Sequence, residues 1–180
     1  MGERVVLTHD GLQRMLKRLS YEILEKNPEH GELALIGIQR RGVFLARRIR
    51  EFIREAEGLD VPFGVIDITL YRDDLTLASA APVVHETNIP FDVSDKTLVL
   101  VDDVLFTGRT VRCALSEIMD FGRPRRIELC VLLDRGHREL PIRADFVGKN
   151  IPTSREELVD VMLQELDGKD EVVVRKKNVG

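Results

Sequence analysis

Apolar residues recur along the chain with two different spacings, and segments with one spacing alternate with segments that have the other. Residues 10–27 place apolar side chains at helical spacing and end before Pro28, so this segment is predicted to be an amphipathic helix. Leu33–Ile38 is a short, continuous apolar run, which is typical of a strand buried on both faces. Helical spacing returns in residues 43–57 and stops at Gly58, so this region is predicted to be a strand, a loop and a second helix.

The second half of the chain continues the same alternation. The further predicted strands are residues 4–7, 63–71, 97–102 and 126–133, and the further predicted helix is residues 110–121, closed by Gly122. Residues 159–163 alternate apolar with polar side chains, residues 167–168 give a turn, and residues 171–175 resume a strand, which predicts a terminal hairpin. Strands that alternate with helices predict an α/β fold with a doubly wound, mainly parallel sheet and helices on both faces.

Composition limits the class of protein. The 180 residues, 43% of them hydrophobic, suffice for one well-packed domain and are too few for two of ordinary size, so we expect a single domain over residues 1–180. A formal net charge of -4 means that any nucleic-acid partner must meet a local basic patch. No apolar run approaches the roughly 20 residues of a membrane span and the N-terminus starts no signal peptide, so we expect a cytoplasmic protein without a membrane partner.

The chain has two cysteines, Cys113 and Cys130, and each lies in an apolar setting. Neither has another Cys or a His nearby at the spacing of metal ligands. The sequence therefore favours buried thiols in a reducing compartment over a disulfide or a zinc site.

The strongest chemical signal lies where the predicted strand 97–102 meets the next helix. That strand delivers Asp102 and Asp103, whose carboxylates can bind the vicinal hydroxyls of a sugar and help to hold a cation. The turn that follows opens a helix, so free N–H groups, two threonine hydroxyls and the helix dipole converge on one anion, which a 5'-phosphate fits. Gly108 lets the backbone approach that phosphate closely. The phosphate-binding residues expected here are Val104, Leu105, Phe106, Thr107, Gly108, Arg109 and Thr110. The alternative is that threonine caps the helix and the two aspartates are merely solvated. This alternative explains a Thr-Gly pair alone, but it explains the whole run of residues 99–111 less well.

This run resembles the signature of type I phosphoribosyltransferases, enzymes that use 5-phosphoribosyl-1-pyrophosphate (PRPP). Residues 37–42 are similar to the pyrophosphate loop of that family, which would present a guanidinium and backbone amides to the leaving pyrophosphate. The residues concerned are Arg40, Arg41 and Gly42. A basic turn that caps a helix is the alternative for this loop taken alone. Where the family carries a mobile hairpin over PRPP, this chain has a long polar stretch that begins with Arg72, Asp73 and Asp74.

Longer segments are similar to the PyrR family, bacterial pyrimidine-operon attenuation regulators that also have uracil phosphoribosyltransferase activity. These segments are residues 67–75, 101–112 and 134–153. The likeness covers essentially the whole chain, and residues 134–153 are specific to that family. Uracil salvage enzymes carry a proline where this chain has Asp103. Hypoxanthine-guanine enzymes usually carry Asp at the position of Phe106 and Lys at that of Asp134, so a purine substrate is disfavoured.

The resemblance implies an enzyme that converts uracil and PRPP to UMP and pyrophosphate, with Mg²⁺ bound together with PRPP. Asp102, Asp103 and Arg41 are the implied catalytic residues, and the magnesium ion is held mainly by PRPP near the two aspartates. Uracil is expected against the loop after the fifth strand, where the binding residues are Arg135, Gly136, Arg138, Phe146 and Val147. No side chain is identified as the general base, because Phe106 stands where purine relatives hold theirs.

The resemblance also implies a regulator that binds pyrimidine-operon leader mRNA in response to UMP or UTP, as a homodimer or a larger homo-oligomer. The first predicted helix carries a basic stripe with an aromatic end, opposite its apolar face. The stripe consists of Arg14, Lys17, Arg18 and Tyr21. Because this face points away from the crevice, charge reversal at Arg14 and Arg18 is expected to remove RNA affinity and to leave uracil turnover nearly unchanged. A solvated polar face is the alternative. It corresponds to a phosphoribosyltransferase that acts only in base salvage, on uracil or less readily on hypoxanthine or guanine.

Overall fold

The computed structural model describes residues 3–68 and 86–176 of the chain. Its helices are α1 (His9–Lys26), α2 (Arg41–Glu57), α3 (Arg109–Asp120) and the short α4 (Gln164–Asp167), with a 3₁₀ turn, η1, at His30–Glu32. Its strands are β1 (Arg4–Leu7), β2 (Leu33–Ile38), β3 (Phe63–Ile66), β4 (Thr97–Leu105), β5 (Arg126–Asp134), β6 (Phe146–Asn150), β7 (Glu157–Met162) and β8 (Glu171–Lys176). Every helix and strand predicted from the sequence is present; β1 and β2 have the predicted ends, and the others differ at one end or both. None of the described helices is long and apolar enough to cross a membrane.

Five parallel strands form the central sheet, in the order β3-β2-β4-β5-β6. After β2 the chain adds β3 on one side, and then returns to place β4 on the other side of β2. The strand order therefore reverses between β2 and β4, which is the position where open α/β sheets bind ligands at their carboxyl ends. The predicted doubly wound sheet is confirmed.

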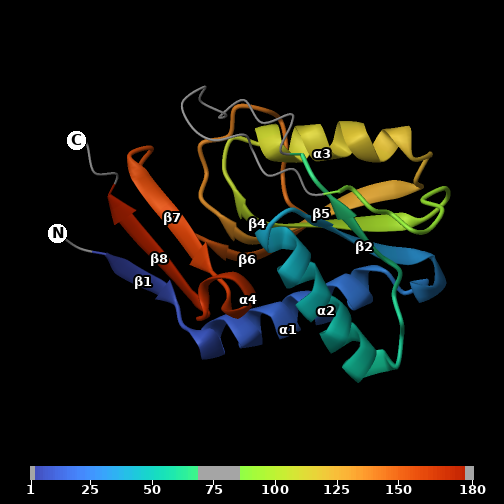
Figure 1. Ribbon diagram of the computed structural model, residues 1–180, viewed down its shortest axis with the longest axis horizontal. Helices are drawn as coiled ribbons and strands as arrows, with labels where there is room; N and C mark the ends of the chain where they lie inside the picture. Colours follow the sequence, from blue (N-terminus) through green and yellow to red (C-terminus); the bar gives the residue numbers. More distant parts are fainter. Residues whose placement is uncertain (1–2, 69–85, 177–180) are drawn as a thin grey trace.

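Helices cover both faces of this sheet (Figure 1). α1 and α2 pack on one face, and α3 packs on the other. α1 lies against the sheet because Leu12, Leu16, Leu19 and Ile23 recur on one side of the helix and are fully buried. Gly58 ends α2 in the left-handed conformation, with φ of 67°, as the sequence predicts for a helix stop.

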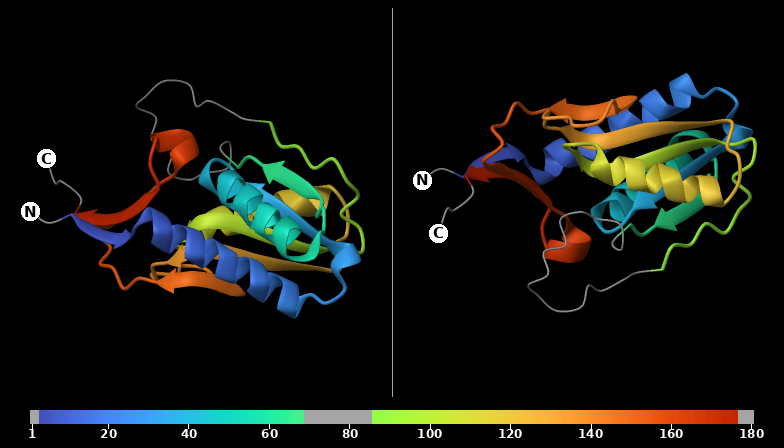
Figure 2. Two further views of the ribbon diagram at one scale, coloured as in Figure 1. Left: turned by 90° about the horizontal axis from the view of Figure 1, so that it is seen from below. Right: turned by 90° about the horizontal axis from the view of Figure 1, so that it is seen from above.

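A second sheet of three antiparallel strands, β1-β8-β7, is called the C-terminal sheet here. β7 and β8 are the predicted terminal hairpin, with α4 between them. β1 joins the sheet by pairing with β8, a long-range contact that the sequence pattern does not predict. Figure 2 shows this sheet at one end of the molecule, with both chain termini beside it.

Two strands differ from the prediction in ways that affect the site. Residues 146–150, expected to be part of a loop, form strand β6 at the edge of the central sheet. Its few apolar residues are followed by Gly148, Lys149 and Asn150, so the local pattern is weak and pairing with β5 determines the strand. β4 extends to Leu105, so Asp102 and Asp103 lie within the strand. The predicted strand 63–71 ends at Ile66, and its last three residues lie outside the described part of the chain.

Candidate active site

The loops after β2 and β4 lie against each other at the point where the strand order reverses. Gly42 is the second residue of α2 and is buried, and a Cβ at this residue would lie 2.4 Å from the carbonyl oxygen of Val101 and 3.1 Å from Asp102 Cα. Only glycine fits this close approach. The loop of residues 39–42 is therefore held directly against the backbone of β4 at Val101 and Asp102.

The turn after β4 presents the open end of a helix to this crevice. Gly108, with φ of 91°, is the N-cap of α3 and has no side chain that could cap the helix. Thr107 Oγ1 accepts a long hydrogen bond of 3.3 Å from the N–H of Arg109. By helix geometry, the remaining N–H groups of the first turn have no carbonyl partner within the helix. The turn can therefore bind an anion such as a phosphate through N–H groups and the helix dipole.

Asp102 and Asp103 are held by the backbone of their own strand. Asp102 Oδ1 accepts a hydrogen bond of 2.9 Å from the N–H of Asp103, and Asp103 Oδ1 accepts one of 2.8 Å from the N–H of Val104. Asp102 is buried, whereas Asp103 is half-buried. Carboxylate oxygens are ligands that Mg²⁺ prefers, and this ion usually takes one or two of them together with water and substrate phosphate oxygens. The pair therefore fits an ion that is shared with a phosphorylated substrate.

The two arginines of the loop after β2 have different surroundings. Arg41 Nε donates to the carbonyl oxygen of Val161 in β7, and its terminal nitrogen lies 3.3 Å from both carboxylate oxygens of Asp167. Arg40 is exposed. Arg41 therefore ties this loop to the C-terminal sheet, while Arg40 presents its guanidinium to solvent.

The loop that follows β5 folds over the phosphate turn through Arg138. The Arg138 guanidinium donates to the carbonyl oxygens of Phe106 and Ile142 and to the carboxylate of Asp134, at 2.6, 2.9 and 2.6 Å. The carbonyl oxygen of Thr107 accepts hydrogen bonds from the N–H groups of the same loop. Arg138 thus joins the end of β4, the end of β5 and the loop between β5 and β6.

Arg135 and His137 enclose the ring of Phe106. The Arg135 guanidinium carbon lies 4.1 Å from the ring centroid, and the His137 ring meets it edge-on at 5.9 Å. Arg135 also donates to the carbonyl oxygens of Ser154 and Glu157 at 2.9 and 2.8 Å. Burial lowers the pKa of Arg135, an effect that Glu157 opposes. Gly136, between the two, is exposed with φ of 77°.

Phe146 and Val147 lie on opposite faces of the sheet. Phe146 is buried in the core beneath α1, with Lys26 Nζ 5.0 Å from its ring centroid. Val147 pairs with Val131, and Val131 pairs with Asp102, so these three residues form one row across β6, β5 and β4. Val147 packs on the α3 face of the sheet. Of the two residues, only Val147 is placed in line with the carboxylates.

Comparison with known proteins follows this geometry. The phosphoribosyl transferase domain family matches residues 6–166. The "Bifunctional protein PyrR" of Pelotomaculum thermopropionicum is 59% identical over 169 residues, which cover 94% of this chain and 93% of the relative. That of Listeria monocytogenes is 56% identical over 177 residues, which cover 97% of each chain. The chain belongs to the PyrR family of phosphoribosyltransferases.

Solved structures of more distant relatives share the fold. A hypoxanthine phosphoribosyltransferase of Trypanosoma cruzi superposes with a TM-score of 0.75 over 98% of this chain and 92% of its own, at 19% identity. One from Staphylococcus aureus gives 0.71 over 97% and 93%, at 20% identity. The PyrR-family chain therefore has the type I phosphoribosyltransferase fold, as the sequence predicts.

The predicted RNA stripe of this PyrR-family chain lies on the exposed side of α1. Arg14, Lys17, Arg18 and Tyr21 are all exposed. Arg18 differs from the other three because its guanidinium reaches the edge strand β6, where it donates to the carbonyl oxygen of Gly148 at 2.5 Å. Lys149, the next residue of β6, is also exposed.

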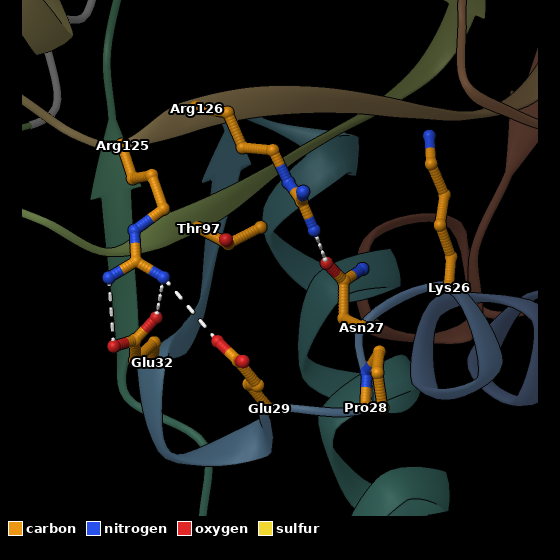
Figure 3. A pocket seen from close by; sticks show the side chains of 8 residues that line it. All are labelled: Lys26, Asn27, Pro28, Glu29, Glu32, Thr97, Arg125 and Arg126. Carbon is orange, nitrogen blue, oxygen red and sulfur yellow. Dashed lines mark hydrogen bonds and ion pairs between the residues drawn. The ribbon is translucent and has the colours of Figure 1, made fainter.

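One surface pocket of about 250 Å³ lies at the opposite, amino end of the strands (Figure 3). Thr97, which begins β4, and Arg126, which begins β5, both line it. Its arginines are already paired: Arg125 with Glu29 and Glu32, and Arg126 with the side-chain oxygen of Asn27. The pocket is therefore remote from the carboxylates and is not part of the site. The predicted residues Arg72, Asp73 and Asp74 lie outside the described residues.

Proposed function

We propose that this chain transfers the phosphoribosyl group of PRPP to uracil, giving UMP and pyrophosphate, and that it binds pyrimidine-operon leader mRNA in response to uridine nucleotides. One observation carries the enzymatic part. A helix N-terminus, two carboxylates and an arginine-bearing loop converge where the strand order reverses, in a chain that is 53–60% identical to members of the PyrR family.

Each part of PRPP has a place in this arrangement. The 5'-phosphate binds at the N-terminus of α3, the ribose hydroxyls bind Asp102 and Asp103, and the pyrophosphate faces Arg40 and the N–H groups near Gly42. Arg41 fixes the loop through its contacts with β7 and Asp167. Mg²⁺, when bound with PRPP beside the two aspartates, neutralises charge on the pyrophosphate.

The reaction then depends on positioning and electrostatics. Uracil N1 forms a bond to C1' of the ribose, the bond from C1' to the pyrophosphate oxygen breaks, and the N1 proton leaves to water or to a pyrophosphate oxygen. The ring of Phe106 is enclosed by Arg135 and His137 and offers no basic group to take that proton. Uracil lies toward the backbone of Val147, in the row that contains Asp102.

The RNA-binding part rests on the exposed stripe of α1. Arg14 and Lys17 project two positive charges from one side of the helix, Tyr21 adds an aromatic ring, and Lys149 of the neighbouring strand adds a further positive charge. Basic side chains bind the phosphate backbone, and an exposed aromatic ring can stack on an unpaired base. The protein acts as a homodimer or a larger homo-oligomer in this proposal.

The test measures both activities on the same preparation. Pyrophosphate release from PRPP and Mg²⁺ is followed with uracil, hypoxanthine and guanine as separate substrates, and we expect release with uracil alone. Leader RNA and an unrelated stem-loop are then titrated with and without UMP. Turnover with a purine at least equal to that with uracil would overturn the substrate assignment. Equal affinity for the two RNAs would leave a base-salvage enzyme.

A further inference from the structure

Arg18 contacts the strand that the proposed function assigns to uracil, although it belongs to the RNA stripe. One terminal nitrogen of its guanidinium donates to the carbonyl oxygen of Gly148 at 2.5 Å and lies 3.4 Å from that of Val147. The other terminal nitrogen donates to Glu22, one helical turn further along α1, at 2.5 Å. Arg18 is half exposed all the same, with 46% of its side-chain surface accessible. One guanidinium therefore meets solvent, α1 and β6 together.

The contact falls where α1 packs tightly against β6. A Cβ at Gly148 would lie 2.4 Å from Met15 Sδ and 2.4 Å from the carbonyl oxygen of Leu132. Met15 and Arg18 are three residues apart and so lie on the same side of the helix. Two side chains of α1, about one helical turn apart, thus hold β6 at one point, Met15 by packing and Arg18 by a hydrogen bond.

β6 has no neighbour on its outer side, because it is the last strand of the central sheet. Carbonyl oxygens on its outer edge need donors from elsewhere, and Arg18 supplies one to the carbonyl oxygen of Gly148. Val147 lies in the same row as Asp102, through Val131. In the proposed function the backbone of Val147 faces uracil, and the carboxylates of β4 hold ribose. A shift of β6 therefore changes the distance between these two groups.

We propose that Arg18 is a positioning residue for the uracil-binding strand and that it couples RNA binding to nucleotide binding. The inference rests on the proposed function. An RNA phosphate that approaches the stripe competes with Glu22 for the guanidinium, since both are anions that accept charge-assisted hydrogen bonds. The restraint on Val147 and Gly148 changes with that competition. Uridine nucleotide, which orders the same strand from inside the crevice, changes the affinity for RNA in return, because coupling between two sites is reciprocal.

The test is Arg18→Lys, which keeps the positive charge and removes the planar guanidinium that reaches both the carbonyl oxygens and Glu22. The Kd for leader RNA is measured with and without saturating UMP, and the ratio of the two values reports the coupling. We expect this ratio to fall by about fivefold, or to fall to one if the coupling is lost altogether. The KM for uracil should rise by a similar factor, while the KM for PRPP and kcat stay within about twofold, because the strand and not the phosphate site is disturbed.

Two comparison variants separate coupling from charge. Arg54→Lys changes an exposed arginine of α2 that is paired with Glu51 and remote from β6, and it should leave every constant unchanged. Arg14→Lys changes the same stripe at a residue that makes no hydrogen bond to β6, so the UMP ratio should persist even if RNA affinity changes. An Arg18→Lys protein that retains both the ratio and the KM for uracil would overturn the inference. If the unmutated protein binds no leader RNA, the regulatory proposal fails by itself, and an unchanged KM for uracil in Arg18→Lys then refutes the positioning role separately.

Discussion

Asp102 and Asp103 meet the crevice differently, although they are adjacent in the sequence. They alternate across β4, so one side chain is buried and the other is half-buried. Each carboxylate also accepts the N–H of the following residue, which fixes its orientation before any ligand arrives. A ribose can therefore meet preorganised acceptors, which is how electrostatic catalysis avoids reorganisation during the reaction.

Replacing both carboxylates should abolish the reaction without unfolding the protein. Asp102→Asn with Asp103→Asn keeps the shape of both side chains and removes both negative charges. We expect uracil-dependent pyrophosphate release to fall by about 100-fold or more, in line with the loss of preorganised electrostatic groups elsewhere. Asp120→Asn, at an exposed carboxylate in the last turn of α3, is the matched control. Near-normal turnover of the double variant, with circular dichroism unchanged, would show that the ribose is held elsewhere.

Replacing an arginine of the loop after β2 should lower the affinity for ligands that carry pyrophosphate more than the affinity for ligands that lack it. Arg41→Ala should weaken PRPP and pyrophosphate binding by about tenfold or more and UMP binding far less, because it releases the loop that faces the pyrophosphate, and each hydrogen bond to a charged group contributes about 1.5–3 kcal/mol. Arg40→Ala removes the exposed guanidinium and should show the same preference. Isothermal titration with the three ligands measures this, with Arg54→Ala as the control. Equal weakening of all three ligands would contradict the assignment of the loop.

Asp167→Asn tests how Arg41 acts. Asp167 lies 3.3 Å from the Arg41 guanidinium and has no other place in the proposed site. If Arg41 holds the loop against the C-terminal sheet, Asp167→Asn should reproduce part of the pyrophosphate effect. If Asp167→Asn leaves pyrophosphate affinity unchanged while Arg41→Ala weakens it, Arg41 binds the ligand without help from this carboxylate.

At the scale of elements, the carboxylate of Asp170 joins the C-terminal sheet to helices α1, α2 and α4. Asp170 is buried, and it accepts two hydrogen bonds from Arg48 of α2, at 2.8 and 2.9 Å, and one from the N–H of Gln164 in α4. It also lies 2.9 Å from His9 Nδ1, at the start of α1. Burial alone raises the pKa of Asp170, but the hydrogen bonds from Arg48 and Gln164 outweigh it and lower the pKa from 3.8 to about 2.

This junction should stabilise the fold at neutral pH and lose its effect in acid. Because the pKa of Asp170 is lower in the folded state than in the unfolded state, its contribution of about 2 kcal/mol is complete above pH 4 and is lost as pH falls toward 2. Asp170→Asn should lower the free energy of unfolding at pH 7 by about 2–4 kcal/mol. The difference between the two proteins should shrink between pH 4 and pH 2, as measured by urea denaturation.

The control for this prediction is another carboxylate of the C-terminal sheet. Asp160 pairs with Arg175 at the surface, so Asp160→Asn should cost at most about 1 kcal/mol. Equal costs for Asp160→Asn and Asp170→Asn, or a pH-independent cost for Asp170→Asn, would show that burial of Asp170 adds nothing to the junction.

The elements with strong local patterns could be predicted from the sequence. β1 and β2 have the predicted ends, and α1, α2 and α3 begin and end within two residues of theirs, because apolar spacing and helix stops are local properties. β6 could not be predicted in this way, since Phe146 and Val147 are followed by glycine and polar residues. The pairing of β1 with β8 joins residues about 170 positions apart, and no local signal encodes it.

The site was predictable to the extent that it is one continuous segment. The phosphate turn and the carboxylates lie within residues 102–110, and their sequence pattern carries their chemistry. The surroundings of the arginines were not predictable, because they depend on partners far along the chain. Arg41 meets Asp167, and Arg138 meets the carbonyl oxygen of Phe106, through the tertiary fold alone.

At the scale of the whole molecule, the proposed RNA face and the proposed crevice lie on different parts of one sheet. The crevice lies at the carboxyl ends of β2 and β4, where the strand order reverses, whereas the stripe of α1 flanks β6, two strands away from β4. Arg18 alone among the stripe residues contacts the sheet by hydrogen bonds. Arg14 and Lys17 are therefore better residues than Arg18 for separating RNA binding from turnover.

Charge reversal at those two residues should separate the two proposed activities. Arg14→Glu with Lys17→Glu should abolish leader-RNA binding and leave uracil turnover nearly unchanged, because both side chains point to solvent from a helix face remote from the crevice. RNA binding by the unmutated protein should also weaken as salt rises, by about 0.7 to 0.9 log units of affinity per log unit of salt for each phosphate contact. A titration of leader RNA at several salt concentrations, beside the turnover assay, measures both effects. The control is Arg54→Glu, which reverses one positive charge on α2 and should leave the affinity for RNA high. If Arg54→Glu weakens RNA binding as much as reversal of the stripe, the interaction follows net charge, and α1 is not the RNA-binding face.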